Sequence, residues 1–402
     1  MTVADRQTGA SPSPSAGPPH RPSSGRDFYI DVLRSAAIVR VVVYHVTEFG
    51  WLTIAFPAMG VMFALGGSLT VRSLTAAEGR AARTARSTPM VMVSRFRRLL
   101  PSVWVFGAVG LITVLGQGYP ISGLRDHPGL LWWLFPLSAP AQPPGDVAWA
   151  FTGGLWYLTA YLWFVLLTPF LLRLFRSWPR WTVGLAIALP VILHLELLTI
   201  GGTFHPQAYD LTQYGACWVL GIAHREGWLP RLPAPVFWSG VGVLTVVVGW
   251  WFVASGQSLR TVDLHEMPVM NALWSAAFAA TLLRIGSHER ITGFIARARA
   301  IPPVRSTVQV LNARALTIYL WHLPCVLLAH SLTDFSSATG PWLSPIVITV
   351  AATGLAVFAV GWVEDVAARR PLTAPWRLPG GPAFQHAVPV RNRDRRSSAK
   401  HG

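Results

Sequence analysis

The chain has 402 residues, of which 52% are hydrophobic and only 12% are charged. Soluble domains carry about a quarter charged residues. Together with a mean hydropathy of +0.43, this composition excludes a set of ordinary soluble domains and favours an all-α, polytopic integral membrane protein. The formal net charge of +16 would suit a nucleic-acid partner, but the arginines are placed as in a membrane protein, as described below, so no nucleic acid is expected.

Local composition divides the chain into three regions. Residues 1–26 are rich in Pro, Ser and Gly and lack the apolar stretch of about 7–15 residues that a signal peptide needs, which predicts a disordered tail. Residues 27–364 hold the apolar segments, and residues 365–402 form a second, basic and mostly disordered tail. Cys217 and Cys325 lie in apolar runs without metal-binding spacing, so no metal is expected.

Ten segments between the tails are apolar and close to the length of about 20 residues that a transmembrane helix requires. The sixth is the weakest, because it contains Asp210, Gln213 and His224. In chain order the ten segments are residues 28–47, 53–74, 99–116, 150–172, 181–200, 209–224, 235–254, 267–285, 313–333 and 342–363.

The arginines indicate which side of the membrane each loop occupies. With the N-terminal tail in the cytoplasm, the outer loops contain only Arg125 and Arg260. Cytoplasmic loops usually carry the excess of arginine, so we expect a multi-pass protein of the cell membrane with both termini cytoplasmic, where these arginines also meet anionic membrane lipid. The inner arginines are Arg80, Arg83, Arg86, Arg95, Arg97, Arg98, Arg173, Arg176, Arg180, Arg225, Arg231, Arg284, Arg290, Arg297, Arg299 and Arg305, followed by a cluster near the C-terminus.

The first span carries polar side chains within an otherwise apolar helix. A charge at membrane depth costs about 2.5–3.5 kcal/mol on insertion scales, so such residues usually face a protein interior or a wet cavity. At about 100° per residue, the step from Arg34 to His45 returns to within roughly 20° of the same helix face. Asp31 and Glu48 fall on this stripe, whereas Arg40 points elsewhere. The pattern predicts an internal polar site.

Two later segments add candidates for chemistry. Arg95, Arg97 and Arg98 place three guanidinium groups at the cytoplasmic mouth of the third span, where they either bind the phosphates of a nucleotide-like ligand such as coenzyme A or serve as flanking charge. The ninth span contains His322, with Arg314 at its inner end. A lone histidine among apolar residues is most often a hydrogen-bonded structural residue, so His322 is a second-rank candidate.

Taken together, these motifs resemble those of the membrane-bound acyltransferase 3 family. Arg34 and His45 match its pattern of an arginine, ten residues and a histidine in the first span. Arg95 and Arg98 match its pattern of an arginine, two residues and an arginine on the first cytoplasmic loop, and Pro101 follows as the family pattern requires. The order and spacing of these motifs are more specific than any one of them.

The resemblance extends over nearly all of residues 27–375, with one departure. The segments "GLWYL" at 154–158 and "IYLWHLP" at 318–324 look like two later landmarks of the family. The second span of the family usually reads Ser-Gly-Phe, where this chain has Gly66-Gly67-Ser68. The two glycines also allow close packing of helices. A contact made by the usual serine is therefore missing here or supplied by Ser68.

The resemblance implies transfer of an acyl group, often acetyl, from cytoplasmic acyl-CoA as co-substrate to a hydroxyl of a glycan, glycolipid or small-molecule acceptor such as a secondary metabolite. The reaction needs a base to take the hydroxyl proton, and positive charge near the developing oxyanion. We expect His45 to be the base, because histidine as a residue type has an ordinary pKa near the working pH, and Arg34 to give electrostatic support. Glu48 or Asp31 would orient the site.

In this scheme Arg95 and Arg98 hold the phosphates of the coenzyme, and the acyl group travels either directly or through an acyl-histidine intermediate. A membrane transporter or flippase is the alternative, because intramembrane charges also mark transport pathways. No internal repeat supports that alternative. A transporter would consume no acyl-CoA, and a purely structural membrane protein would tolerate replacement of Arg34 and His45.

Overall fold

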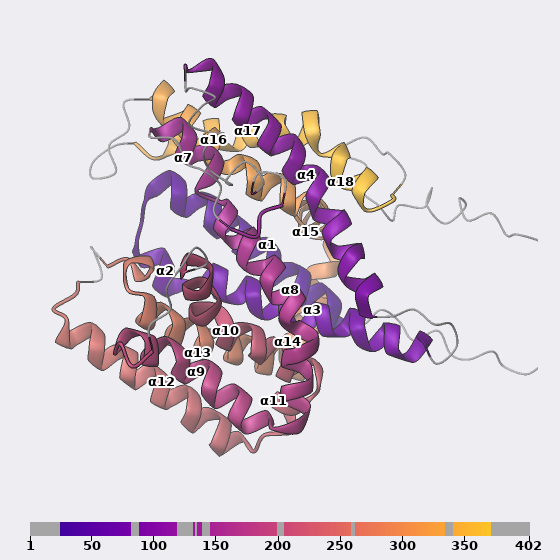
Figure 1. The fold of residues 1–402 in the computed structure, drawn as a ribbon, viewed down its shortest axis with the longest axis vertical. Coiled ribbons are helices and arrows are strands. Elements are labelled where there is room, and N and C mark those ends of the chain that lie inside the picture. The colour runs from indigo at the N-terminus through magenta and orange to yellow at the C-terminus, as the bar shows by residue number, and fades with distance from the viewer. Residues whose placement is uncertain are drawn as a thin grey trace, which may run out of the picture.

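The computed structural model describes residues 25–81, 88–118, 132, 135–138, 145–198, 205–258, 262–333 and 341–370. Every regular element in these ranges is a helix (Figure 1). Most of residues 1–26 and 365–402, for which disordered tails are predicted, lie outside the described residues. The same holds for Arg125 and Arg260 of the predicted outer loops.

Each of the ten expected spans coincides with a helix. These helices are α1 (Gly25–Thr47), α3 (Ala58–Ala81), α4 (Thr88–Gly116), α8 (Leu155–Ser177), α9 (Pro179–His194), α10 (His205–Arg225), α12 (Ala234–Ala254), α13 (Pro268–Ile285), α16 (Ala315–Leu332) and α17 (Leu343–Val360). The shorter helices are α2 (Trp51–Ala55), α7 (Asp146–Thr152), α11 (Trp228–Arg231), the 3₁₀-helix η1 (Leu264–Glu266), α14 (Glu289–Ala300), α15 (Pro302–Ala313) and α18 (Trp362–Ala367).

Seven helical stretches of the described chain are long and apolar enough to cross a membrane, and they contain α3, α4, α8, α12, α13, α16 and α17. The all-helical, polytopic fold is thereby confirmed. The other three expected spans fall short for physical reasons. Helix α9 has only 16 residues, α1 carries several charged side chains, and α10 is rich in polar side chains. The number of ten spans stays a prediction.

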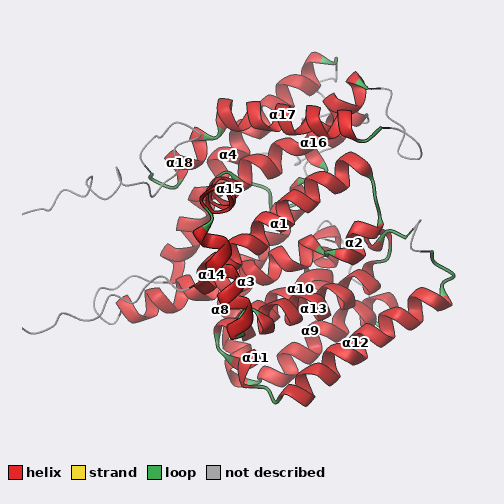
Figure 2. Cartoon of the chain, turned by 180° about the vertical axis from the view of Figure 1, so that it is seen from behind, coloured by secondary structure: helices red, strands yellow, loops and turns green. Residues whose placement is uncertain are grey.

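Burial separates inner from outer helices. In α3 and the residues before it, 67% of the most apolar window is buried inside the protein, compared with 11% in α12 and 17% in α17. Helices α12 and α17 lie on opposite outer sides of the molecule, with α1 and α3 between them (Figures 1 and 2). An outer apolar helix suits contact with lipid, whereas an inner helix can position a site.

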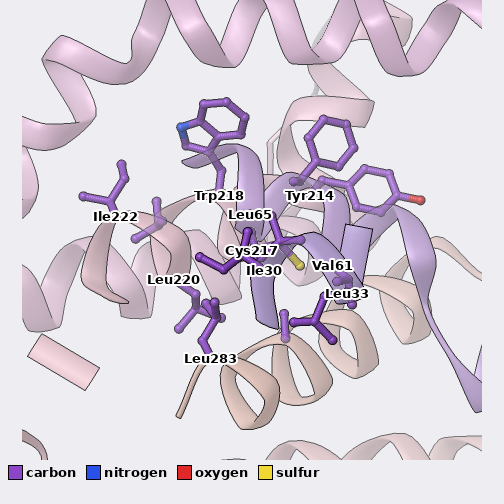
Figure 3. Close-up of a cluster of buried hydrophobic side chains, with 14 of the residues drawn as sticks. Ile30, Leu33, Val61, Leu65, Tyr214, Cys217, Trp218, Leu220, Ile222 and Leu283 are labelled. Carbon is purple, nitrogen blue, oxygen red and sulfur yellow. The ribbon is translucent and has the colours of Figure 1, made fainter. Parts of the chain in front are cut away.

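The centre of the fold is the crossing of α3 and α10. A Cβ atom at Gly67 would clash with the carbonyl oxygen of Trp218, and one at Gly221 would clash with that of Ala64. The two backbones therefore approach closely because glycine occupies both positions, as in other small-residue helix contacts. Figure 3 shows the side chains around this crossing, among them Val61, Leu65, Tyr214, Cys217, Trp218 and Ile222, with Ile30 and Leu33 from α1.

A polar clamp fastens α18 to the start of α16. The Arg314 guanidinium lies 2.7 Å from Asp365 Oδ2, and both side chains are at most 3% exposed. Arg314 also donates to the carbonyl oxygen of Gly361, and Thr317 donates through its backbone N–H and its hydroxyl to Glu364. The Glu364 carboxylate thus satisfies a donor that the first turn of α16 leaves without a helical partner.

Candidate active site

A cavity of about 1110 Å³ lies between α1, α3, α4, α8, α16 and α18. It occupies the side of the molecule where α3 ends, α4 begins and α18 lies, on the right in Figure 1. Its basic lining residues are Arg34, Arg72, Arg95, Arg97, Arg98, Arg369 and Arg370. Glu364 is the one acidic residue in the described lining. The cavity is therefore strongly positive and suited to a phosphorylated ligand.

Arg95 is held rigidly at the wall of this larger cavity. Its guanidinium donates to the hydroxyl of Tyr161 at 2.7 Å, to the carbonyl oxygen of Leu69 at 2.8 Å and to the hydroxyl of Ser73 at 3.0 Å. Arg98 lies one turn further along α4 and its side chain is exposed. The two members of the predicted arginine pair thus line one cavity, but Arg95 also joins α4 to α3 and α8.

A second cavity, of about 370 Å³, lies between α1, the junction of α7 and α8, α10, η1 and α16. Three histidines, His45, His265 and His322, line it together with Arg40. The other polar and aromatic lining residues are Asp210, Gln213, Trp149, Trp156, Tyr214 and Tyr319. This smaller cavity combines groups that can exchange a proton with aromatic faces and hydrogen-bonding side chains.

His45 and His322 are neighbours in the smaller cavity, with ring centroids 5.2 Å apart. His322 is only 1% exposed, and its Nδ1 is hydrogen-bonded to the carbonyl oxygen of Tyr319. Because a carbonyl oxygen can only accept, Nδ1 carries the proton and Nε2 is the bare acceptor. Within the described chain Nε2 has no hydrogen-bond partner. His322 is therefore held in the tautomer that can accept a proton in the cavity.

The third histidine belongs to a network that the sequence did not reveal. The backbone N–H of His265 donates to Asp263 Oδ1 at 2.8 Å, and its ring Nδ1 lies 3.7 Å from the same oxygen. The Tyr44 hydroxyl donates to Asp263 Oδ2. Burial lowers the pKa of His265, although Asp263 acts in the opposite direction, so the ring is neutral near pH 7. Asp263 and His265 lie at η1, more than two hundred residues after Tyr44 of α1, so no helical spacing links them to α1.

The residues predicted on one stripe of α1 have different surroundings. Arg34 lines the larger cavity and donates to Asn312 Oδ1 at 3.3 Å, whereas His45 lines the smaller one. Asp31 and Glu48 line neither cavity. Glu48 is exposed and directly follows α1 with a φ of 55°, the left-handed conformation common after a helix end.

Arg40 lies in the cavity of His45, although helical projection pointed it elsewhere. Its guanidinium stacks over the Tyr44 ring at 4.9 Å, and its Nε donates to the carbonyl oxygen of Leu52. A helical projection shows only the direction of each Cβ atom. The long Arg40 side chain extends around the helix and reaches Tyr44, the neighbour of His45. In the sequence, the only sign that Arg40 belongs to the site is that a charged residue stands inside an otherwise apolar span.

The structure also places the segment Gly66-Gly67-Ser68, in which the second span departs from the family pattern. Gly66 lines the larger cavity. Ser68 is buried and hydrogen-bonded to His224 Nδ1 at 3.1 Å, and it lines neither cavity. Ser68 therefore supplies no contact to either cavity.

The fold and the two cavities define a helical, multi-pass membrane protein with an internal polar site. A family model described as an acyltransferase domain matches residues 27–361, most of the chain. The protein therefore belongs to the acyltransferase 3 family of membrane-bound enzymes, and it is an acyltransferase. Neither the comparison with curated proteins nor that with solved structures finds a significant match.

Proposed function

We propose that this acyltransferase moves an acyl group, often acetyl, from cytoplasmic acyl-CoA to a hydroxyl of a carbohydrate, glycolipid or secondary metabolite at the cell membrane. The observation that carries the proposal is the pair of cavities. An arginine-lined cavity lies beside a histidine-lined cavity, and Tyr319 lines both. This arrangement suits a phosphorylated donor on one side and a hydroxylated acceptor on the other.

The larger cavity suits the donor in charge, size and position. Guanidinium groups bind phosphates in bidentate fashion, and coenzyme A carries several phosphates. At about 1110 Å³ the cavity is at the upper end of ligand pockets, which span about 300–1,000 Å³. Its lining includes residues at the end of α3 and the start of α4, a junction that the arginine bias predicts to be cytoplasmic.

The smaller cavity suits a hydroxylated ring. Trp156 stacks on Tyr214 with ring centroids 5.6 Å apart, which offers flat apolar faces. Asp210 and Gln213 line the same cavity and provide hydrogen-bond acceptors and donors for hydroxyl groups. A small number of polar groups on an otherwise apolar wall fixes the orientation of a small ligand.

The proposed chemistry uses His45 as the base. His45 takes the proton of the acceptor hydroxyl, the hydroxyl oxygen bonds to the thioester carbon, and the carbon–sulfur bond breaks. The proton then returns to the thiolate, which leaves as free coenzyme A. Arg40 shares the cavity of His45 and places positive charge near the developing oxyanion, whereas Arg34 lines the donor cavity and gives electrostatic support to the donor. An acyl-His45 intermediate is the alternative route to the same products.

Donor binding gives the direct test. Arg98→Gln should weaken acetyl-CoA binding by about tenfold or more, because a hydrogen bond to a charged group contributes roughly 1.5–3 kcal/mol. Arg290→Gln is the matched control, since Arg290 is also exposed and predicted to be cytoplasmic, but lines neither cavity. Binding is measured by calorimetry on detergent-purified protein.

Equal donor affinity in the two variants would assign Arg98 to membrane topology alone. Turnover separates the enzyme from the transporter or flippase that the sequence also suggested. The acyltransferase releases free thiol from acetyl-CoA, whereas a transporter releases none.

A further inference from the structure

We infer that Tyr319 is the partition between the donor and acceptor cavities, and that the acyl group reaches His45 only by passing its ring. The inference rests on the proposed function of the two cavities. Of all residues described as lining either cavity, Tyr319 is the one that lines both. The side chain is only 9% exposed, so it fills the space between the cavities.

Contacts on both sides hold the Tyr319 ring in place. Its hydroxyl donates to the carbonyl oxygen of Gly154 at 2.7 Å, and Gly154 lines the smaller cavity. On the donor side its ring centroid lies 5.1 Å from that of Tyr157, which lines the larger cavity. On the acceptor side the ring centroid of His322 lies at 5.5 Å. Tyr319 therefore contacts groups of both cavities.

The hydrogen bond to Gly154 ties the partition to a specific joint of the fold. Gly153 and Gly154 separate α7 from α8, and α16 brings Tyr319 against this joint. The backbone of Tyr319 also holds His322, because its carbonyl oxygen accepts from His322 Nδ1. One residue thus separates the cavities with its side chain and orients a cavity histidine with its main chain.

The position of Tyr319 between the cavities affects whether water can reach the thioester. For transfer, the thioester carbon must come within about 3–3.5 Å of the acceptor oxygen, so the acyl group has to enter past the ring. If the ring is loosened or removed, water from the acceptor cavity reaches the thioester. Water then adds to the acyl carbon, the carbon–sulfur bond breaks, and the products are a carboxylic acid and free thiol. Tyr319 is accordingly a positioning residue that suppresses hydrolysis.

The experiment measures thiol release from acetyl-CoA by the purified full-length protein without any acceptor. Tyr319→Phe keeps the ring but removes the hydrogen bond, and it should raise hydrolysis about two- to tenfold, the factor that loss of one neutral hydrogen bond gives. Tyr319→Ala removes the ring and should raise hydrolysis further. Acetyl-CoA affinity, measured in parallel, should stay within about twofold of the unmodified protein, because the phosphate-binding arginines are untouched.

Tyr29→Phe is the matched control. The Tyr29 hydroxyl also donates to a backbone carbonyl oxygen, that of Leu282 at 3.0 Å, and the side chain is 7% exposed. Tyr29 lines neither cavity, so its variant should hydrolyse acetyl-CoA at the unmodified rate. A general loss of stability lowers hydrolysis, whereas an opened partition raises it.

Two results separate failure of this inference from failure of the proposed function. Unchanged hydrolysis in a Tyr319→Ala protein that still binds acetyl-CoA overturns the partition and leaves the donor site standing. If Tyr319→Ala does not fold, unchanged hydrolysis in Tyr319→Phe has the same meaning. Absence of acetyl-CoA binding in the unmodified protein overturns the proposed donor, and the partition with it.

Discussion

At the scale of single residues, α1 serves both cavities. Arg34 reaches the larger cavity and His45 the smaller one, although the two share a helix face, because they lie about 16 Å apart along the axis. A helix that crosses the fold next to α3 can therefore present one side chain to the donor and another to the acceptor. Under the proposed function, the arginine–histidine spacing in the first span connects the donor cavity with the acceptor cavity.

His45→Ala should lower acyl transfer by about 10²–10⁴-fold while leaving acetyl-CoA affinity unchanged, because a general base acts mainly in the transition state. Turnover and donor binding are measured on one detergent preparation. His194→Ala is the control, since His194 is exposed at the end of α9 and lines neither cavity. Full turnover in the His45→Ala protein would rule out the proposed base.

Replacing Glu48 tests whether this residue, which the sequence predicts to orient the site, has any effect on catalysis. Because Glu48 is exposed and has a φ of 55°, glycine should adopt this conformation with less strain. We expect Glu48→Gly to keep its turnover and to unfold at an equal or slightly higher temperature. A Glu48→Gly protein that folds normally but loses activity would show that the carboxylate acts on the site.

At the scale of elements, the close crossing of α3 and α10 positions the cavities. Helix α10 brings Asp210, Gln213 and Tyr214 to the smaller cavity, and α3 brings Gly66 and Leu69 to the larger one. The contact depends on glycine at the crossing. Packing of these two helices therefore decides whether both cavities have their observed walls.

Gly221→Ala should destabilise the protein by about 1–3 kcal/mol, because the new methyl group meets the carbonyl oxygen of Ala64 and forces the helices apart. Gly215→Ala on the same helix is the control, since a Cβ atom at Gly215 would meet no atom of another helix within 4 Å. That variant should be as stable as the unmodified protein or up to about 1 kcal/mol more stable. Thermal unfolding in detergent compares the two, and equal effects would exclude the crossing as their cause.

At the scale of the whole molecule, the two cavities lie toward opposite sides of the helical bundle. The larger one is lined by α18, the end of α3 and the start of α4, whereas the smaller one is lined by η1 and the first half of α10. If the arginine bias sets the orientation, the donor enters from the cytoplasm and the acceptor cavity faces the other side.

Reporter fusions test this orientation. A reporter after Gln257, between α12 and η1, should be extracytoplasmic, and one after Arg86, between α3 and α4, should be cytoplasmic. The bias of arginine toward one set of loops is the reason for the expectation. A cytoplasmic signal at Gln257 would contradict the orientation and would place both cavities on the wrong sides for the proposed reaction.

Local sequence patterns determined the helices and the family. Apolar runs near the membrane thickness predicted a helix at each of the ten positions, because in lipid the backbone must satisfy its own hydrogen bonds. The motifs around Arg34, His45, Arg95 and Arg98 led to the acyltransferase 3 family, which the family model confirms. Such patterns are readable because they depend on neighbours along one helix.

The tertiary structure decided which of these residues meet. His322 lies beside His45, and Asp263 joins Tyr44 to His265, although each pair is separated by more than two hundred residues. No spacing along the chain encodes contacts that arise from helix packing. The division into two cavities, the position of Arg40 and the partition at Tyr319 likewise follow from how α1, α8, α10 and α16 pack together, since only packing determines which side chains enclose a shared space.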